Sequence, residues 1–122
     1  MKTKTKIQII DETVKYYSTH KRALGCVYLT NEGNMCAVGR CITKKEIGNL
    51  SGIGDVEELS EVYDSKIPFK SSYKGHSLEF WQHLQSFHDW DGYWLENNKG
   101  GWNLSSTGIE RLERLKQMYA NN

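Results

Sequence analysis

The chain has 122 residues with 16 Lys or Arg and 15 Asp or Glu, so its formal net charge is +1. This balance does not indicate nucleic acid, a membrane surface or an acidic partner, and no apolar run is long enough to span a bilayer. We expect a single domain over residues 1–122. The basic start of the chain is not followed by the apolar stretch of a signal peptide, which predicts a cytoplasmic protein.

The charge is unevenly distributed along the chain. Residues 1–24 hold six Lys or Arg and two acids, which gives +4, whereas residues 51–100 hold nine acids and four Lys or Arg, which gives −5. This layout suits a homodimer or an interface of mixed sign. It also fits two solvated faces of a monomer, the interpretation that we prefer.

The first third of the chain predicts a helix followed by a β-hairpin. Asp11 can cap a helix that runs to about Ala23, because its carboxylate accepts a hydrogen bond from a free amide of the first turn. β-Branched and aromatic residues then flank an Asn- and Gly-rich turn at 31–34. That pattern is typical of two antiparallel strands and predicts a hairpin over residues 25–42.

Two short helices are expected next. Thr43, with a Glu three residues later, forms a capping box in which the hydroxyl and the carboxylate each bind a free amide. Asp55 opens another short helix that ends near Tyr63. Pro68 cannot continue a helix, so we expect residues 64–76 to be extended or irregular.

The second half of the chain predicts two helices with a hairpin between them. Ser77 caps a helix that runs to about Asp89, and residues 92–104 can form a hairpin that turns at 97–101. A capping box at Thr107 opens the final helix. The apolar residues at helical spacing are Phe80, Leu84 and Phe87 in one helix and Ile109, Leu112, Leu115 and Tyr119 in the other. These elements predict a small α+β domain in which antiparallel hairpins pack against several helices.

Cysteine and histidine side chains are candidate ligands for a structural zinc ion, because zinc prefers thiolates and imidazoles. They are Cys26, Cys36, Cys41, His76, His83 and His88. Two thiols facing each other in the predicted hairpin, with one histidine of the helix over 77–89, could complete a site. The cysteine spacing lacks the two-residue separation of a zinc knuckle, and free thiols are the interpretation that we favour.

A cysteine nucleophile is a second candidate chemistry, with Cys36 and His88 as the pair. An imidazole that accepts the thiol proton generates the reactive thiolate, and a third group orients the imidazole. Asp89 is not expected to orient His88, since adjacent side chains on a helix diverge by about 100°. The alternative for His88 is a place at the helix C-terminus, where an imidazole interacts well with the helix dipole.

The tryptophans are concentrated in residues 81–102. They are Trp81, Trp90, Trp94 and Trp102. Exposed tryptophans beside polar groups suit the stacking of bases or a protein interface. The alternative is that Trp81 and Trp102 belong to the core and that the other two cover its edge.

We assign a ligand surface to this aromatic segment. It consists of Trp90, Tyr93, Trp94 and Asn97. Arg40 or Arg111 can add a bidentate contact to a phosphate or a carboxylate. The expected function is therefore binding rather than catalysis, and a Cys/His enzyme or zinc protein is the alternative.

The segment 102–108 and the final helix resemble the junction of wing and helix in winged-helix proteins, which bind DNA. However, residues 77–101 hold four acids and one Lys, and the helix over 77–89 has neither Lys nor Arg. Neutralisation of phosphates dominates affinity for DNA. A winged-helix DNA-binding protein therefore stays a lesser alternative.

Two motifs resemble those of a group of short, uncharacterised proteins of tailed phages and prophages. They are Cys26-Val-Tyr28 with Gly33-x-x-Cys36-Ala-Val-Gly39, and Leu84-Gln85-x-x-His88-Asp89. The resemblance covers roughly residues 10–118 and implies a phage accessory protein in the cytoplasm of a bacterial host. Its expected partner is a host protein or a nucleotide-like defence signal, and its expected role is counter-defence.

Overall fold

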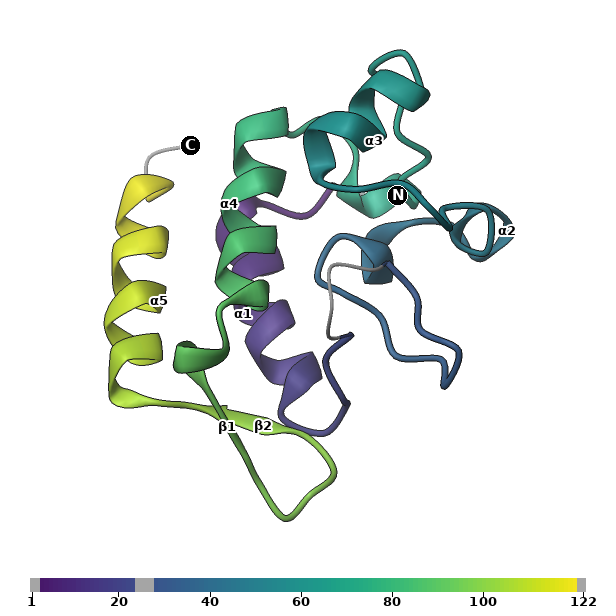
Figure 1. The fold of residues 1–122 in the computed structure, drawn as a ribbon. Coiled ribbons are helices and arrows are strands. Elements are labelled where there is room, and N and C mark those ends of the chain that lie inside the picture. Colours follow the sequence, from purple (N-terminus) through teal and green to yellow (C-terminus); the bar gives the residue numbers. More distant parts are fainter. Residues whose placement is uncertain (1–2, 24–27, 121–122) are drawn as a thin grey trace.

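The computed structural model describes residues 3–23 and 28–120, and five α-helices and one antiparallel hairpin within them confirm the α+β class (Figure 1). The helices are α1 (Lys6–Tyr17), α2 (Lys44–Ile47), α3 (Val56–Val62), α4 (Leu78–Asp89) and α5 (Ser106–Met118). The strands are β1 (Trp94–Glu96) and β2 (Trp102–Leu104), and the 3-10 turns are η1 (Gly39–Cys41), η2 (Ser71–Tyr73) and η3 (Asp91–Tyr93). No helix of the described part is long and apolar enough to cross a membrane.

Helix α4 lies at the centre of the core. Its buried apolar residues are Phe80, Trp81, Leu84 and Phe87. The ring centre of Tyr17 in α1 lies 5.0 Å from that of His88, and the ring centre of Tyr119, just after α5, lies 5.3 Å from that of Phe80. Figure 1 shows α5 alongside α4, with the β1–β2 hairpin beyond one end of the helices. The spacing of apolar residues in the sequence therefore predicted the central helix and its buried face.

Helix α1 begins and ends earlier than predicted. Thr5, not Asp11, is its N-cap: the Thr5 hydroxyl accepts the N–H of Gln8 (3.1 Å), and the Gln8 side chain accepts the N–H of Thr5 (2.8 Å). Asp11 lies inside the helix, where its carboxylate is 2.9 Å from Nζ of Lys116. The predicted continuation to Ala23 is wrong, because polar side chains after the helix bind its last carbonyls.

The hairpin predicted over the first cysteines is also wrong in its extent. The expected turn is present, with one antiparallel bridge between Leu29 and Met35. The chain then folds into η1 instead of continuing as a strand, and Sγ of Cys36 accepts the N–H of Gly39 at 3.2 Å. Residues 24–27 of the predicted first strand lie outside the described residues.

The remaining helix starts agree with the sequence except in two caps. Asp55 and Ser77 accept an N–H of the first turn of α3 and α4, as predicted. α2 forms after Thr43, but the Thr43 side chain makes no capping bond. α5 is capped by Ser105 rather than Thr107. The predicted second hairpin is confirmed in the antiparallel pairing of β1 and β2.

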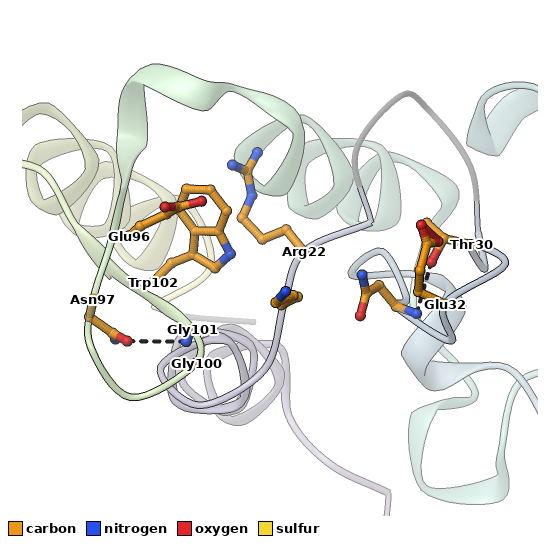
Figure 2. Close-up of a pocket in the computed structure, with 10 residues that line it drawn as sticks. Arg22, Thr30, Glu32, Glu96, Asn97, Gly100, Gly101 and Trp102 are labelled. Atoms are coloured by element: carbon orange, nitrogen blue, oxygen red, sulfur yellow. Dashed lines mark hydrogen bonds between the residues drawn. The ribbon is translucent and has the colours of Figure 1, made fainter.

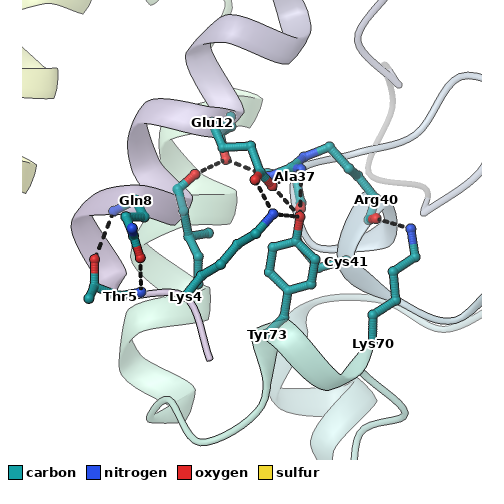
Figure 3. A network of polar contacts seen from close by, with 11 residues as sticks. Lys4, Thr5, Gln8, Glu12, Ala37, Arg40, Cys41, Lys70 and Tyr73 are labelled. Atoms are coloured by element: carbon teal, nitrogen blue, oxygen red, sulfur yellow. Dashed lines mark hydrogen bonds and ion pairs between the residues drawn. The ribbon is translucent and has the colours of Figure 1, made fainter. Parts of the chain in front are cut away.

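A polar network ties α1 to η1 and η2 (Figure 3). Nη1 of Arg40 lies 2.5 Å from Oε1 of Glu12, and Nη2 of Arg40 donates to the Thr13 hydroxyl at 3.0 Å. Lys4 and the Tyr73 hydroxyl bind the same carboxylate. Burial by itself raises the pKa of Glu12, but these hydrogen bonds outweigh burial and lower the pKa to about 2. Arg40 is therefore part of the buried framework and does not lie on the predicted ligand surface.

Candidate functional site

The segment around Cys36 contacts the end of α4 through Gln85. Oε1 of Gln85 accepts the N–H of Val38 (3.1 Å), and Nε2 of Gln85 donates to Oδ1 of Asp89 (2.9 Å). The same Asp89 oxygen lies 2.7 Å from Nδ1 of His88. Asp89 therefore does contact its neighbour His88, against the prediction. Both residues lie in the last turn of α4.

Among the described residues, no hydrogen bond joins Cys36 to His88: Sγ of Cys36 contacts the N–H of Gly39, and Nδ1 of His88 contacts Asp89. Burial raises the pKa of Cys36 to about 12, so its thiol is neutral. Burial also lowers the pKa of His88, against the opposing effect of the bond to Asp89. Nε2 of His88 is buried without a hydrogen-bond partner among the described residues. This environment favours a packing role for Cys36 over the role of nucleophile.

The described candidate zinc ligands are buried or contact other groups of the protein. Burial raises the pKa of Cys41 to about 12. His76 lies within hydrogen-bond distance of a backbone carbonyl, and His83 of a tyrosine hydroxyl. Within the described part of the chain, no three His, Cys, Asp or Glu side chains are grouped so as to hold a metal ion. Cys26 lies outside the described residues.

The tryptophans divide between core and surface in a different way from the prediction. Trp81 is buried as expected, but Trp94 takes the second core position and donates its indole N–H to the carbonyl of Phe87 (3.0 Å). Trp102 is half-buried. Trp94 is the first residue of β1, directly after η3, and its ring centre lies 5.3 Å from that of Phe87 in α4.

The predicted ligand surface is not one face of the molecule. Trp90 is 60% exposed, and its ring centre is 6.2 Å from that of the half-buried Tyr93. Asn97 instead builds the hairpin turn, where its Oδ1 accepts two backbone N–H groups at 2.8 and 3.1 Å. Arg111 is half-buried on α5. Of the predicted surface, Trp90 and Tyr93 therefore lie side by side, whereas Trp94 is buried in the core.

A cleft of about 430 Å³ opens between the β1–β2 hairpin and the turn at 30–34 (Figure 2). We call it the hairpin cleft. It is lined by Lys21, Arg22, Thr30, Glu32, Asn34, Glu96, Asn97, Gly100, Gly101 and Trp102. Residues 21–22, residues 30–34 and the distant hairpin residues 96–102 therefore build it, and Asn97 is the one predicted ligand residue among those that line it.

Arg22 is the buried member of the hairpin cleft, with 3% of its surface exposed. Its Nε and Nη2 donate to the carbonyl of His88 at 3.0 and 2.5 Å, and Nη2 is 3.1 Å from Oδ1 of Asp91. Its Cζ lies 5.5 Å from the ring centre of Trp94 and 5.1 Å from that of Trp102, within cation–π range. Sequence reasoning missed this role of Arg22, because its hydrogen-bond partners follow 66 and 69 residues later.

The rim of the hairpin cleft carries both signs of charge. Lys21, Glu32 and Glu96 are exposed there, and Figure 2 shows Glu96 beside Trp102 on the hairpin. An aromatic or aliphatic group can pack on the half-buried Trp102 while charged groups of either sign meet the rim. The arrangement suits non-covalent binding in which polar groups surround an apolar contact.

These features define a small α+β domain with a polar cleft built around a buried arginine. Comparison with known protein families, with curated proteins and with solved structures finds no match to the chain. The hairpin cleft is therefore interpreted from its own geometry.

Proposed function

We propose that this chain is a binding protein that holds a segment of another protein in the hairpin cleft. The observation that carries the proposal is the placement of Arg22. Its buried guanidinium lies within cation–π range of two tryptophan rings, and one of them, the half-buried ring of Trp102, lines the cleft. Tryptophan side chains contribute much of the affinity in protein interfaces, and the contact with the buried Arg22 fixes the Trp102 ring in the wall of the cleft.

The charges of the cleft favour a polypeptide over a nucleotide. A phosphate near Lys21 would also approach the carboxylates of Glu32 and Glu96, and like charges oppose association. A peptide presents donors, acceptors and charges of both signs, which the cleft can match. Of the two partners expected from the sequence, the cleft therefore suits the host protein better than the nucleotide-like signal.

The resemblance to tailed-phage proteins supports the cellular part of the proposal. We place the protein in the cytoplasm of a bacterial host, where it inhibits a host protein in counter-defence. A second copy of this chain is the competing occupant of the cleft, since the uneven charge along the sequence also suits a homodimer.

Site-directed photo-cross-linking in bacterial cells tests the proposal. We would introduce p-benzoylphenylalanine at Glu96, in the cleft, and at Glu113, an exposed position on α5, as the control. We expect a cross-linked host protein from position 96 alone. That protein, once purified, should bind the double variant Glu32→Lys, Glu96→Lys about tenfold more weakly than the unchanged chain, which corresponds to about 1.4 kcal/mol.

Three results would count against the proposal. Equal products from the cleft and the control positions would show collisional labelling. A product of twice the chain mass would make the cleft a contact between copies of this chain. A host protein whose affinity is unchanged by the double variant would bind elsewhere.

A further inference from the structure

A second cavity, of about 630 Å³, lies where the segment after α3 meets the start of α4. We call it the α3–α4 cavity. It is lined by Ser60, residues 65–69, residues 74–76, Leu78 and Trp81, and it shares no residue with the hairpin cleft. Its volume falls in the range of small-molecule sites, roughly 300–1,000 Å³.

One side of the α3–α4 cavity is apolar. Phe69 and Trp81 are buried and stacked, with ring centres 4.3 Å apart and planes at 19°. Ile67, Pro68 and Leu78 are half-buried around them. An apolar body in the cavity would remove these three side chains from water, which favours binding.

The charged side chains of the α3–α4 cavity are cationic. Lys66 and Lys74 are exposed, and neither forms an ion pair with any described residue. No Asp or Glu stands among the described residues that line the cavity. Burial lowers the pKa of His76, so at neutral pH the two lysines supply the charge. The start of α4 at Leu78 adds the positive end of a helix dipole at the same wall.

The backbone beside the cavity adopts an uncommon conformation. Asp64 and Ser65 both have positive φ values, 51° and 66°, which non-glycine residues adopt at a cost. They turn the chain between α3 and Lys66, and the N–H of Ser65 donates to the carbonyl of Ser60 at 2.7 Å. This turn brings Ser65 and Lys66 to the lining of the cavity.

Trp81, which lines the cavity, also carries a buried donor. Nε1 of Trp81 has no hydrogen-bond acceptor among the described residues. A buried indole N–H usually has one, and leaving it unpaired costs free energy.

We propose that the α3–α4 cavity binds a small organic anion. Its apolar body packs on Ile67, Pro68 and Leu78, and its carboxylate, phosphate or sulfonate meets Lys66 and Lys74. The contrast with the hairpin cleft is in charge, because that cleft presents two acids and this cavity presents none. The site is independent of the proposed protein-binding function.

Two naphthalene probes that differ in charge test this proposal. They are 8-anilinonaphthalene-1-sulfonate, which is anionic, and N-phenyl-1-naphthylamine, which has the same rings without the sulfonate. Fluorescence titration would compare the unchanged chain with Lys66→Glu, Lys74→Glu. The control Lys44→Glu, Lys45→Glu changes net charge equally at two exposed lysines of α2.

We expect the cavity pair to weaken binding of the sulfonate at least tenfold and the control pair to weaken it less than threefold. Both pairs should leave binding of the neutral probe within twofold, which also shows that the folds are intact. If the cavity pair and the control pair weaken binding of the sulfonate equally, the effect comes from net charge alone and the proposal fails. Equal affinity of the unchanged chain for both probes, or no binding of the sulfonate at millimolar concentration, would also overturn the proposal.

Discussion

Among single residues, Arg22 links the end of α4 to the tryptophan rings of the β1–β2 hairpin. Replacing Arg22 by Met would leave the buried carbonyl of His88 without its two donors. We expect the free energy of unfolding to fall by about 2–4 kcal/mol, because an unpaired buried polar group costs about 1–3 kcal/mol and the contacts with two tryptophan rings are lost as well. Urea unfolding followed by circular dichroism measures this loss.

The neighbouring Lys21 gives the matched control for that experiment. Lys21 is exposed, so Lys21→Met should change the free energy of unfolding by no more than about 0.5 kcal/mol. Similar losses from Lys21→Met and Arg22→Met would mean that the buried contacts of Arg22 contribute no net stability. The hairpin cleft would then lack the rigid base on which the proposed function depends.

Gly39 is a second residue on which the structure depends. A Cβ at this position would lie 2.3 Å from the backbone oxygen of Tyr28. Gly39→Ala should therefore lower the free energy of unfolding by about 1–3 kcal/mol, the usual cost of overpacking. Gly48 has open space and an ordinary helical φ of −68°, so Gly48→Ala should be neutral or raise stability by up to about 1 kcal/mol. Equal melting temperatures for Gly39→Ala and Gly48→Ala would contradict the close approach of Gly39 to the backbone of Tyr28.

Among the elements, those with a local start signal could be predicted from the sequence. Ser77 and Asp55 stand directly before an apolar period, and both cap the helices expected of them. Asp11 carried the same local signal but lies inside α1, because Thr5 supplies a complete capping box six residues earlier. A single cap residue therefore does not show which of two starts is used when the other start has both halves of a capping box.

Features fixed by distant contacts could not be predicted. The turn around Cys36 replaces the expected strand, and the N–H of Val38 in it donates to Gln85, 47 residues later. The same limit applies to the hairpin cleft: Asn97 was marked by its turn sequence, whereas Arg22 has no local signal. Its role depends on a carbonyl at the end of α4 and on two rings of the hairpin.

The start of α5 allows a direct test of one such correction. The Ser105 hydroxyl accepts the N–H of Gly108 (3.0 Å) and donates to the carbonyl of Gly92 (2.7 Å). Ser105→Ala should lower the free energy of unfolding by about 1–2 kcal/mol, as loss of a helix cap does. Thr107→Ala should change it by less than about 0.5 kcal/mol, since Thr107 is exposed within the first turn. If chemical denaturation shows that Thr107→Ala lowers the free energy of unfolding more than Ser105→Ala does, then Thr107 is the cap, as the sequence predicted.

For the whole molecule, buried titratable groups define a pH range of maximal stability. Burial lowers the pKa of His76 and His88 from 6.5, so the unfolded chain binds more protons and stability falls as the pH drops below about 6.5. Hydrogen bonds hold the pKa of Glu12 at about 2, against 4.5 when unfolded, which adds a loss between those values. Burial raises the pKa of Cys36 and Cys41 from 9.0 to about 12, so stability also falls as the pH rises through that interval.

The free energy of unfolding should therefore be greatest between about pH 6.5 and pH 9. Urea unfolding at intervals from pH 3 to pH 10 measures the profile. Glu12→Gln should be less stable at pH 7, because it removes a carboxylate bound by Lys4, Arg40 and the Tyr73 hydroxyl. Its acid limb should lack the further loss below pH 4.5 yet keep the fall that begins near pH 6.5, since the histidines are unchanged. A maximum below pH 6, or an acid limb that Glu12→Gln leaves unaltered, would show that these groups do not have the surroundings described.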